Sequence, residues 1–134
     1  MYGIDTNVLV RFITQDDPEQ AAIATELFER RFSADTPGFV SVVALAETWW
    51  VLRRSYRYSA AAVAEAVERI LQMDNLVVER EQDVFISMVA AKEGQGEFAD
   101  ALIGALNLRA GCDCTLSFDR RALRLPGFLD ASEI

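Results

Sequence analysis

The sequence predicts an α/β protein in which a central, mostly parallel sheet of about four to five short strands is flanked by helices. Short apolar segments alternate along the chain with longer segments of helical periodicity, and this alternation is typical of parallel sheets. The 134 residues are 51% hydrophobic and include 3 prolines, so the chain has enough apolar side chains for one core of ordinary size. We therefore expect a single domain over residues 1–134.

The first half of the chain is predicted to alternate between strands and helices. Residues 2–4 form a short apolar run, which predicts a strand ending at Asp5. Asp17 and Pro18 predict a helix start, because aspartate is a good N-cap and proline fits the first helical position. Ser41 and Ser59 are the expected N-caps of the next helices. The expected elements are strands 2–4 and 39–40 and helices 8–13, 18–32, 42–54 and 60–71.

The second half repeats this alternation. Residues 76–78 are apolar, follow a turn and predict a strand. Gly94 and Gly96 separate two helices, and Gly111 fits the left-handed position just beyond the end of the second one. The expected elements are strand 76–78, helices 82–92 and 98–110, strand 112–117, and a short turn or helix over 120–123.

The absence of histidine narrows the possible chemistry. The chain has 0 histidines and 2 cysteines, which excludes histidine-based triads, histidine zinc sites and acid–base catalysis by imidazole. Cys112 and Cys114 cannot form a structural zinc site on their own. We expect them to be small buried hydrophobic residues in a reducing compartment. Carboxylates or hydroxyls must therefore carry any catalysis.

Charge and hydropathy suggest where the protein acts but do not decide its partner. Lys and Arg number 13 against 21 Asp and Glu, a net charge of −8, which disfavours non-specific binding to nucleic acid. No apolar run of about 18 residues predicts a membrane span, and the N-terminus does not resemble a signal peptide, so we expect a cytoplasmic protein without membrane contact. Two arginine clusters are candidate phosphate contacts, or else solvated and ion-paired surface: Arg53, Arg54 and Arg57, and Arg120, Arg121 and Arg124.

Two aspartates follow predicted strands. Asp5 comes directly after the first strand, and Asp119 follows the last one. Ligands of open parallel sheets bind at the carboxyl ends of the strands, so we expect both carboxylates at the same edge of the sheet. Capping of the next helix is an alternative role for each of them.

Two further acids lie in apolar helical segments. Glu47 lies within SVVALAETWWVL, a helix that we expect to be largely buried, and a buried carboxylate needs a cation or several hydrogen-bond donors. An ion pair with Arg54 or a shallow surface position is the alternative for Glu47. Asp100 lies in the first turn of its predicted helix, where a favourable interaction with the helix dipole is the alternative role.

Together, these four carboxylates predict a metal site. Two unit charges about 4 Å apart repel by about 4 kcal/mol at an effective dielectric constant of about 20, so carboxylates that converge need a divalent cation. Oxygen ligands without histidine or cysteine favour Mg²⁺ or Mn²⁺. Because carboxylate-bound Mg²⁺ most often serves phosphate chemistry, the pattern indicates a metal-dependent phosphoryl-transfer or phosphodiester site.

Three segments of the chain resemble a known family. They are the opening IDTNVLVRFITQDDPEQ, the segment SVVALAETWWVL, and the C-terminal FADALIGALNLRAGCDCTLSFDRRAL. With these segments the sequence resembles the PIN-domain ribonucleases, in particular the VapC-type toxins of bacterial toxin–antitoxin pairs, over essentially its whole length. Ser117 stands where many members carry threonine, and this difference keeps the hydroxyl group.

The resemblance implies a PIN-like three-layer sandwich and a ribonuclease that uses Mg²⁺ or Mn²⁺ to hydrolyse RNA with metal-activated water. It implies that Asp5, Asp100 and Asp119 hold the ion, directly or through water, while Glu47 belongs to the same acidic set and orients or deprotonates the water. The matching positions that support this site by hydrogen bonds are Thr6, Asn7 and Ser117.

The resemblance also implies two protein partners. One is a second copy of the chain in a homodimer, and the other is a cognate VapB-type antitoxin that inserts a C-terminal segment near the acidic site. Four aromatic residues are candidates for lining this groove or the dimer surface, with core packing or partial burial as the alternative. They are Trp49, Trp50, Tyr56 and Tyr58.

Two other functions remain as alternatives. A PIN-like fold without catalysis would serve as an RNA- or protein-binding scaffold, but a scaffold has no need for four mutually repelling carboxylates. A phosphatase would use Asp5 as a covalent nucleophile. Such enzymes usually carry a second aspartate two residues later and a supporting lysine, whereas here Asn7 is at that position and Lys92 is the only lysine.

Overall fold

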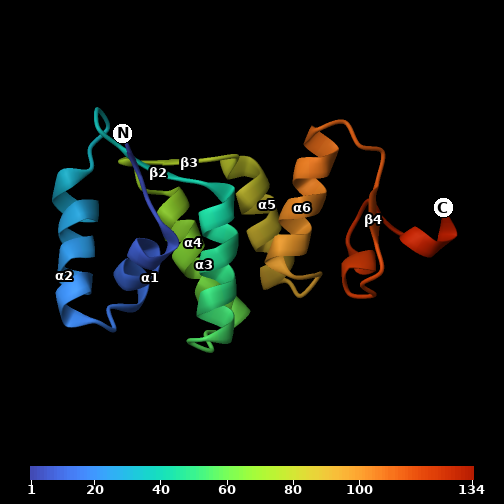
Figure 1. The fold of residues 1–134 in the computed structure, drawn as a ribbon, viewed down its shortest axis with the longest axis horizontal. Coiled ribbons are helices and arrows are strands. Elements are labelled where there is room, and N and C mark those ends of the chain that lie inside the picture. Colours follow the sequence, from blue (N-terminus) through green and yellow to red (C-terminus); the bar gives the residue numbers. More distant parts are fainter. The chain divides into compact units, whose positions relative to one another are not determined.

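The computed structural model describes all residues 1–134, and the chain forms two compact units. The N-terminal unit is Met1–Glu81 and the C-terminal unit is Gln82–Ile134. Both contain helices and parallel strands, so the predicted α/β fold is confirmed (Figure 1). None of the helices has the length and apolar character that a membrane-spanning segment needs. That residues 1–134 fold as one domain stays a prediction.

The N-terminal unit is built on a three-stranded parallel sheet in the order β1-β2-β3. Tyr2 and Gly3 of β1 pair with β2, and all three residues of β2 pair with β3. The elements of this unit are β1 (Tyr2–Gly3), α1 (Thr6–Thr14), α2 (Pro18–Glu26), a π-helical turn (Leu27–Arg31), β2 (Gly38–Val40), α3 (Val42–Arg54), α4 (Ala60–Leu71) and β3 (Leu76–Val78).

The predicted helix starts of this unit are confirmed at three caps. The side chain of Asp17 accepts a hydrogen bond from the backbone N–H of Gln20, and Ser41 and Ser59 cap α3 and α4 in the same way. The helix predicted over residues 18–32 is α2 continued by the π-helical turn. Each cap satisfies an N–H group that has no partner within its helix.

Strand β2 lies in the middle of the sheet and can approach its neighbours closely because it begins with glycine. A Cβ atom at Gly38 would lie 2.6 Å from Cδ1 of Ile4 and 2.9 Å from Cδ2 of Leu76. The core of this unit contains several fully buried side chains, which are Leu9, Phe28, Val40, Leu45, Leu52, Val63, Val67 and Ile70.

The C-terminal unit contains two helices and a pair of parallel strands. Strand β4 pairs with β5 from Thr115 opposite Phe128 to Ser117 opposite Asp130. A Cβ atom at Gly104 of α6 would lie 2.6 Å from Cε1 of Phe128, so this glycine lets the strand pair pack closely on α6. The elements are α5 (Glu81–Lys92, whose first residue belongs to the other unit), α6 (Phe98–Arg109), β4 (Thr115–Ser117), β5 (Phe128–Asp130) and 3-10 turns at Ala122–Arg124 and Ala131–Glu133.

The structure differs from the sequence prediction at the end of the chain. Strand β4 begins at Thr115 rather than at residue 112, and strand β5 was not expected. Gly111 has a φ of +95°, which confirms its predicted left-handed conformation just beyond α6. Residues 112–114, directly after this glycine, form an irregular connection before the strand begins.

Candidate functional site

Asp5 lies at the carboxyl end of β1 and caps α1. Its Oδ1 accepts a hydrogen bond of 2.8 Å from the backbone N–H of Thr6, so the capping role considered for it is confirmed. Ile4 and Thr6 are buried on either side, whereas Asp5 itself is exposed. The local fold therefore fixes the carboxylate at the strand end and leaves it accessible to a cation or a substrate.

Asn7 is exposed and lines a small pocket between α1 and α2 that has a volume of about 200 Å³. Arg11 and Gln20 line the same pocket, and the Arg11 Nε donates to Oε1 of Gln20 at 2.8 Å. Asn7 and Thr6 thus lie beside Asp5 at the start of α1, as predicted. Their supporting role remains a prediction.

Glu47 lies on an exposed side of α3, so the expectation that its helix position is buried is wrong. The buried residues of α3 are Ala44, Leu45, Thr48, Trp49 and Leu52. Val43 and Trp50, which are close to Glu47 on the helix, are 75% and 57% exposed. The alternative of a surface position is therefore what the structure shows, and no ion pair joins Glu47 to Arg54.

Asp100 lies in the first turn of α6 and is half-buried. Burial raises the pKa of its carboxyl group, and the negative charges of Asp119 and Glu97 raise this pKa further. The positive charge of Arg121 lowers it but does not compensate. Burial and negative charge at the ionised carboxylate of Asp100 therefore outweigh the one nearby positive charge, that of Arg121.

Asp119 is exposed in the turn after β4, and two hydrogen bonds fix its position. Its backbone N–H donates to Oγ of Ser117 at 3.0 Å, and its Oδ1 accepts from the backbone N–H of Arg121 at 2.8 Å. Ser117 therefore positions the backbone of Asp119, and its supporting role in an acidic site stays a prediction. The Arg121 side chain is paired with Glu97, with 2.7 Å between Nη2 and Oε1.

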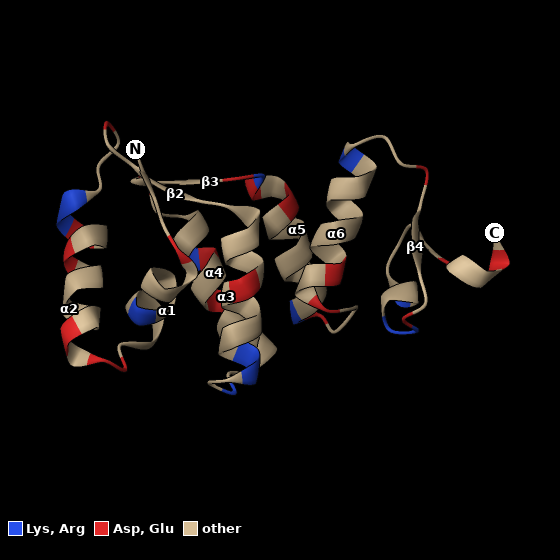
Figure 2. Cartoon of the chain, in the orientation of Figure 1, with Lys and Arg blue, Asp and Glu red and all other residues tan.

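The four candidate carboxylates are divided between the units, with Asp5 and Glu47 in one and Asp100 and Asp119 in the other. Acidic residues mark α3 and the N-terminal end of α6 in Figure 2. Within the C-terminal unit, Asp100 and Asp119 are close enough for their charges to interact. Within neither unit do three or more aspartate, glutamate or cysteine side chains form a group that could hold a metal ion. The convergence of all four carboxylates stays a prediction.

The candidate arginines have different surroundings. Arg53 donates to the carbonyl oxygen of Tyr58 at 2.9 Å, and the guanidinium of Arg54 lies 5.8 Å from the ring centroid of Trp50. Arg121 is paired with Glu97, whereas Arg120 is exposed and makes no ion pair. Arg120 thus shares with Arg57 and Arg124 an exposed guanidinium that forms no ion pair and is available to a phosphate.

The two cysteines were predicted to be buried, and this prediction is wrong. Cys112 is exposed and Cys114 is half-buried, and both are free thiols. They precede β4 instead of forming part of it, because the chain is still in the irregular connection that follows Gly111. Among the aromatic residues, Trp49 is 4% exposed and belongs to the core, whereas Trp50 is exposed.

Two polar clusters were not predicted from the sequence. Arg109 of α6 forms two hydrogen bonds with the buried Asp83 of α5, at 2.6 and 3.1 Å. In the N-terminal unit, Tyr56 donates to Oδ2 of Asp16 at 2.7 Å and accepts from Arg11 at 3.0 Å. The partners are far apart in sequence in both clusters, so no local pattern indicates them.

Glu97 is a neighbour of Asp100 that was not predicted, although its spacing from Asp100 in the sequence indicates it. It lies three residues before Asp100, at the N-cap of α6, so both acids belong to the same end of the helix. Its charge contributes to the raised pKa of Asp100, and its side chain binds Arg121. Glu97 therefore lies near Asp100 and holds the cationic side chain of Arg121 close to it.

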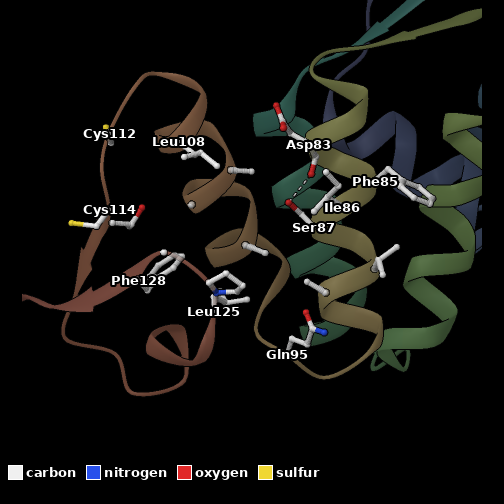
Figure 3. A pocket seen from close by; sticks show the side chains of 18 of the residues that line it. Asp83, Phe85, Ile86, Ser87, Gln95, Leu108, Cys112, Cys114, Leu125 and Phe128 are labelled. Atoms are coloured by element: carbon white, nitrogen blue, oxygen red, sulfur yellow. Dashed lines mark hydrogen bonds between the residues drawn. The ribbon is translucent and has the colours of Figure 1, made fainter.

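The C-terminal unit also contains an apolar pocket with a volume of about 530 Å³ (Figure 3). Ile86 on α5, Leu108 on α6 and Phe128 on β5 are among its lining residues, together with Cys112 and Cys114. None of the four candidate carboxylates lines this pocket. It is therefore separate from the candidate acidic site.

The geometry defines a parallel α/β protein with exposed or half-buried carboxylates after β1, on α3, at the start of α6 and after β4. The family model described as PIN domain matches residues 2–127. The chain therefore belongs to the PIN domain family, whose members are generally nucleases that hydrolyse nucleic acids. Among curated proteins, no sequence matches this chain.

Proposed function

We propose that this chain is a metal-dependent endoribonuclease and the toxin of a VapBC-type toxin–antitoxin pair. Membership of the PIN domain family supports the nuclease activity. The observation that carries the metal dependence is the environment of Asp100, where burial and the charges of Asp119 and Glu97 raise the carboxyl pKa. A divalent cation beside Asp100 and Asp119 would offset the negative charge that Arg121 alone does not balance.

The available donors fit Mg²⁺ or Mn²⁺, because all of them are carboxylate oxygens. In this proposal Asp5, Asp100 and Asp119 hold the ion directly or through water. When bound, the ion lowers the pKa of water and offsets the charge that develops on the phosphate. The hydrogen bonds from Thr6 to Asp5 and from Asp119 to Ser117 hold two of these residues in place.

Glu47 is proposed as the residue that orients or deprotonates the attacking water. Its exposure on α3 supports this role, because a base must reach the water whose proton it accepts. Glu47→Gln should keep metal affinity largely intact and abolish cleavage. Loss of both metal affinity and cleavage would show instead that Glu47 belongs to the metal ligands.

The decisive experiment is cleavage of a cellular RNA pool with Mg²⁺ or Mn²⁺, with EDTA as the metal-free control. Wild-type protein should give discrete products that require metal, and Asp100→Asn purified in the same way should give none. The matched control is Asp74→Asn, which changes an exposed aspartate in the turn before β3 and should cleave like the wild type. Equal cleavage by the wild type and Asp100→Asn would refute the proposed site.

Metal binding can be measured without RNA. A ligand that binds only the folded protein raises its melting temperature, so Mg²⁺ should stabilise the wild type and Asp74→Asn. It should stabilise Asp100→Asn much less. An equal Mg²⁺-dependent shift in all three proteins would exclude Asp100 from the metal site, whatever the RNA result.

We further propose that the chain acts in the cytoplasm, forms a homodimer and is inhibited by a VapB-type antitoxin. Exposed apolar side chains support contact with protein partners, because such side chains are unfavourable in water. On α3 these include Val43 and Trp50, and on α5 they include Phe85 and Ile86. Light scattering of the purified chain should give the mass of a dimer, and a monomer at micromolar concentration would contradict the homodimer.

A further inference from the structure

We propose that Phe118 stacks on a base of single-stranded RNA next to the scissile phosphodiester. This inference rests on the proposed ribonuclease function and adds how the substrate is held. Phe118 is 81% exposed, which makes it the most exposed aromatic side chain of the protein. It directly precedes Asp119 in sequence.

The backbone around Phe118 is ordered. The hydrogen bond from the N–H of Asp119 to Oγ of Ser117 spans Phe118, and the next hydrogen bond joins Asp119 to the N–H of Arg121. These hydrogen bonds fix the backbone from which the Phe118 side chain extends into solvent. Because the backbone is already ordered, stacking need order only the two side-chain torsions of Phe118.

The position of Phe118 indicates what would stack on it. Successive Cα atoms are about 3.8 Å apart, so the backbone of Phe118 adjoins that of Asp119, whose carboxylate is proposed to hold the catalytic metal. Arg120, on the other side of Asp119, is exposed and unpaired and is available to a phosphate. Three consecutive residues thus offer complementary groups to RNA. The aromatic ring of Phe118 suits a base, the proposed metal ligand Asp119 suits the scissile bond, and the cation of Arg120 suits the adjoining phosphate.

The charge of the protein favours stacking as a source of affinity. With a net charge of −8, the chain attracts the RNA backbone poorly. Stacking does not depend on charge, and single-strand-binding proteins commonly use aromatic side chains for it. Trp50 is less suited to this role, because the guanidinium of Arg54 already lies 5.8 Å from its ring centroid.

Three substitutions at one position test the proposal. Phe118→Trp keeps an aromatic face, Phe118→Leu keeps an apolar side chain without one, and Phe118→Ala removes both. The matched control is Leu108→Ala, which removes a side chain that is 72% exposed and lies near the C-terminal end of α6. Circular dichroism of each variant establishes that it is folded before binding is measured.

Binding is measured by fluorescence anisotropy of a labelled single-stranded RNA in EDTA, so that no metal-dependent cleavage occurs. Phe118→Ala and Phe118→Leu should weaken binding by about 5-fold or more, since stacking of one base contributes roughly 5- to 160-fold in affinity. Phe118→Trp and Leu108→Ala should bind like the wild type. An RNA of equal length that lacks its bases should bind all five proteins equally weakly.

Two results would overturn the proposal. If Phe118→Leu binds like the wild type, the aromatic face is not used. If Phe118→Ala keeps its RNA affinity but changes the mass measured by light scattering, Phe118 contacts another protein chain. In either case, metal-dependent cleavage by the wild type would leave the proposed nuclease intact. A wild type that neither binds nor cleaves RNA would refute both the stacking and the nuclease.

Discussion

Removal of Arg109 tests whether one ion pair holds α6 to α5. Arg109 binds both carboxylate oxygens of Asp83, at 2.6 and 3.1 Å, and the Asp83 side chain is only 8% exposed. Breaking a buried ion pair by removing one partner costs about 3–5 kcal/mol. The Arg109 side chain is 44% exposed, so water reaches the carboxylate once the guanidinium is gone, and we expect a smaller cost of about 2 kcal/mol.

This cost corresponds to a fall in melting temperature of about 7 °C for Arg109→Ala, at an unfolding entropy of about 2.1 cal/mol/K per residue. Thermal denaturation followed by circular dichroism measures it. The matched control is Arg30→Ala, because the Arg30–Glu26 pair is 3.6 Å long with side chains 74% and 53% exposed, and surface pairs contribute about 0.5 kcal/mol. Arg109→Lys keeps the positive charge but not the paired hydrogen bonds. Its melting temperature should therefore lie between those of Arg109→Ala and Arg30→Ala. If Arg109→Ala melts no lower than Arg30→Ala, the ion pair does not hold these helices.

At pH 7 without divalent ions, Asp100→Asn should melt at a higher temperature than the wild type, because burial and the charge of Asp119 disfavour the ionised carboxylate. The folded-state pKa of Asp100 is raised, so the wild type gains stability by protonation as the pH falls. The difference in melting temperature between Asp100→Asn and the wild type should therefore shrink towards about pH 4. A difference that is constant with pH would contradict the raised pKa of Asp100. Gly38→Ala should cost about 1–3 kcal/mol in chemical denaturation, because its Cβ would lie 2.6 Å from Cδ1 of Ile4. The control Gly3→Ala meets no atom within 4 Å and should be nearly neutral, and equal effects of the two substitutions would refute the packing argument.

Local signals in the sequence account for most of the helices. Asp17, Ser41 and Ser59 each accept the hydrogen bond that their position predicts, because capping depends only on residues three positions apart. Strand β5 was missed, since a three-residue strand is defined by its pairing with β4 and not by its own composition. The ion pair between Asp83 and Arg109 spans 26 residues and leaves no local pattern.

The candidate site was predicted less completely than the fold. Asp5 and Asp119 follow strands as expected, because the order of strands and turns is readable from the sequence. Glu47 was expected to be buried because its segment is apolar, but Val43 and Trp50 share its exposed side of α3. Apolar composition alone therefore does not identify the buried side of a helix. The rise in the pKa of Asp100 depends on Asp119, whose proximity only the folded chain reveals.

The exposed thiol of Cys112 has a practical consequence for work with the purified protein. Accessible thiols of two molecules can join in a disulfide when the solution is oxidising. Such cross-linking would produce a species of twice the mass without any natural interface. The mass of the chain should therefore be measured with a reducing agent present, and Cys112→Ser gives the same safeguard in long experiments.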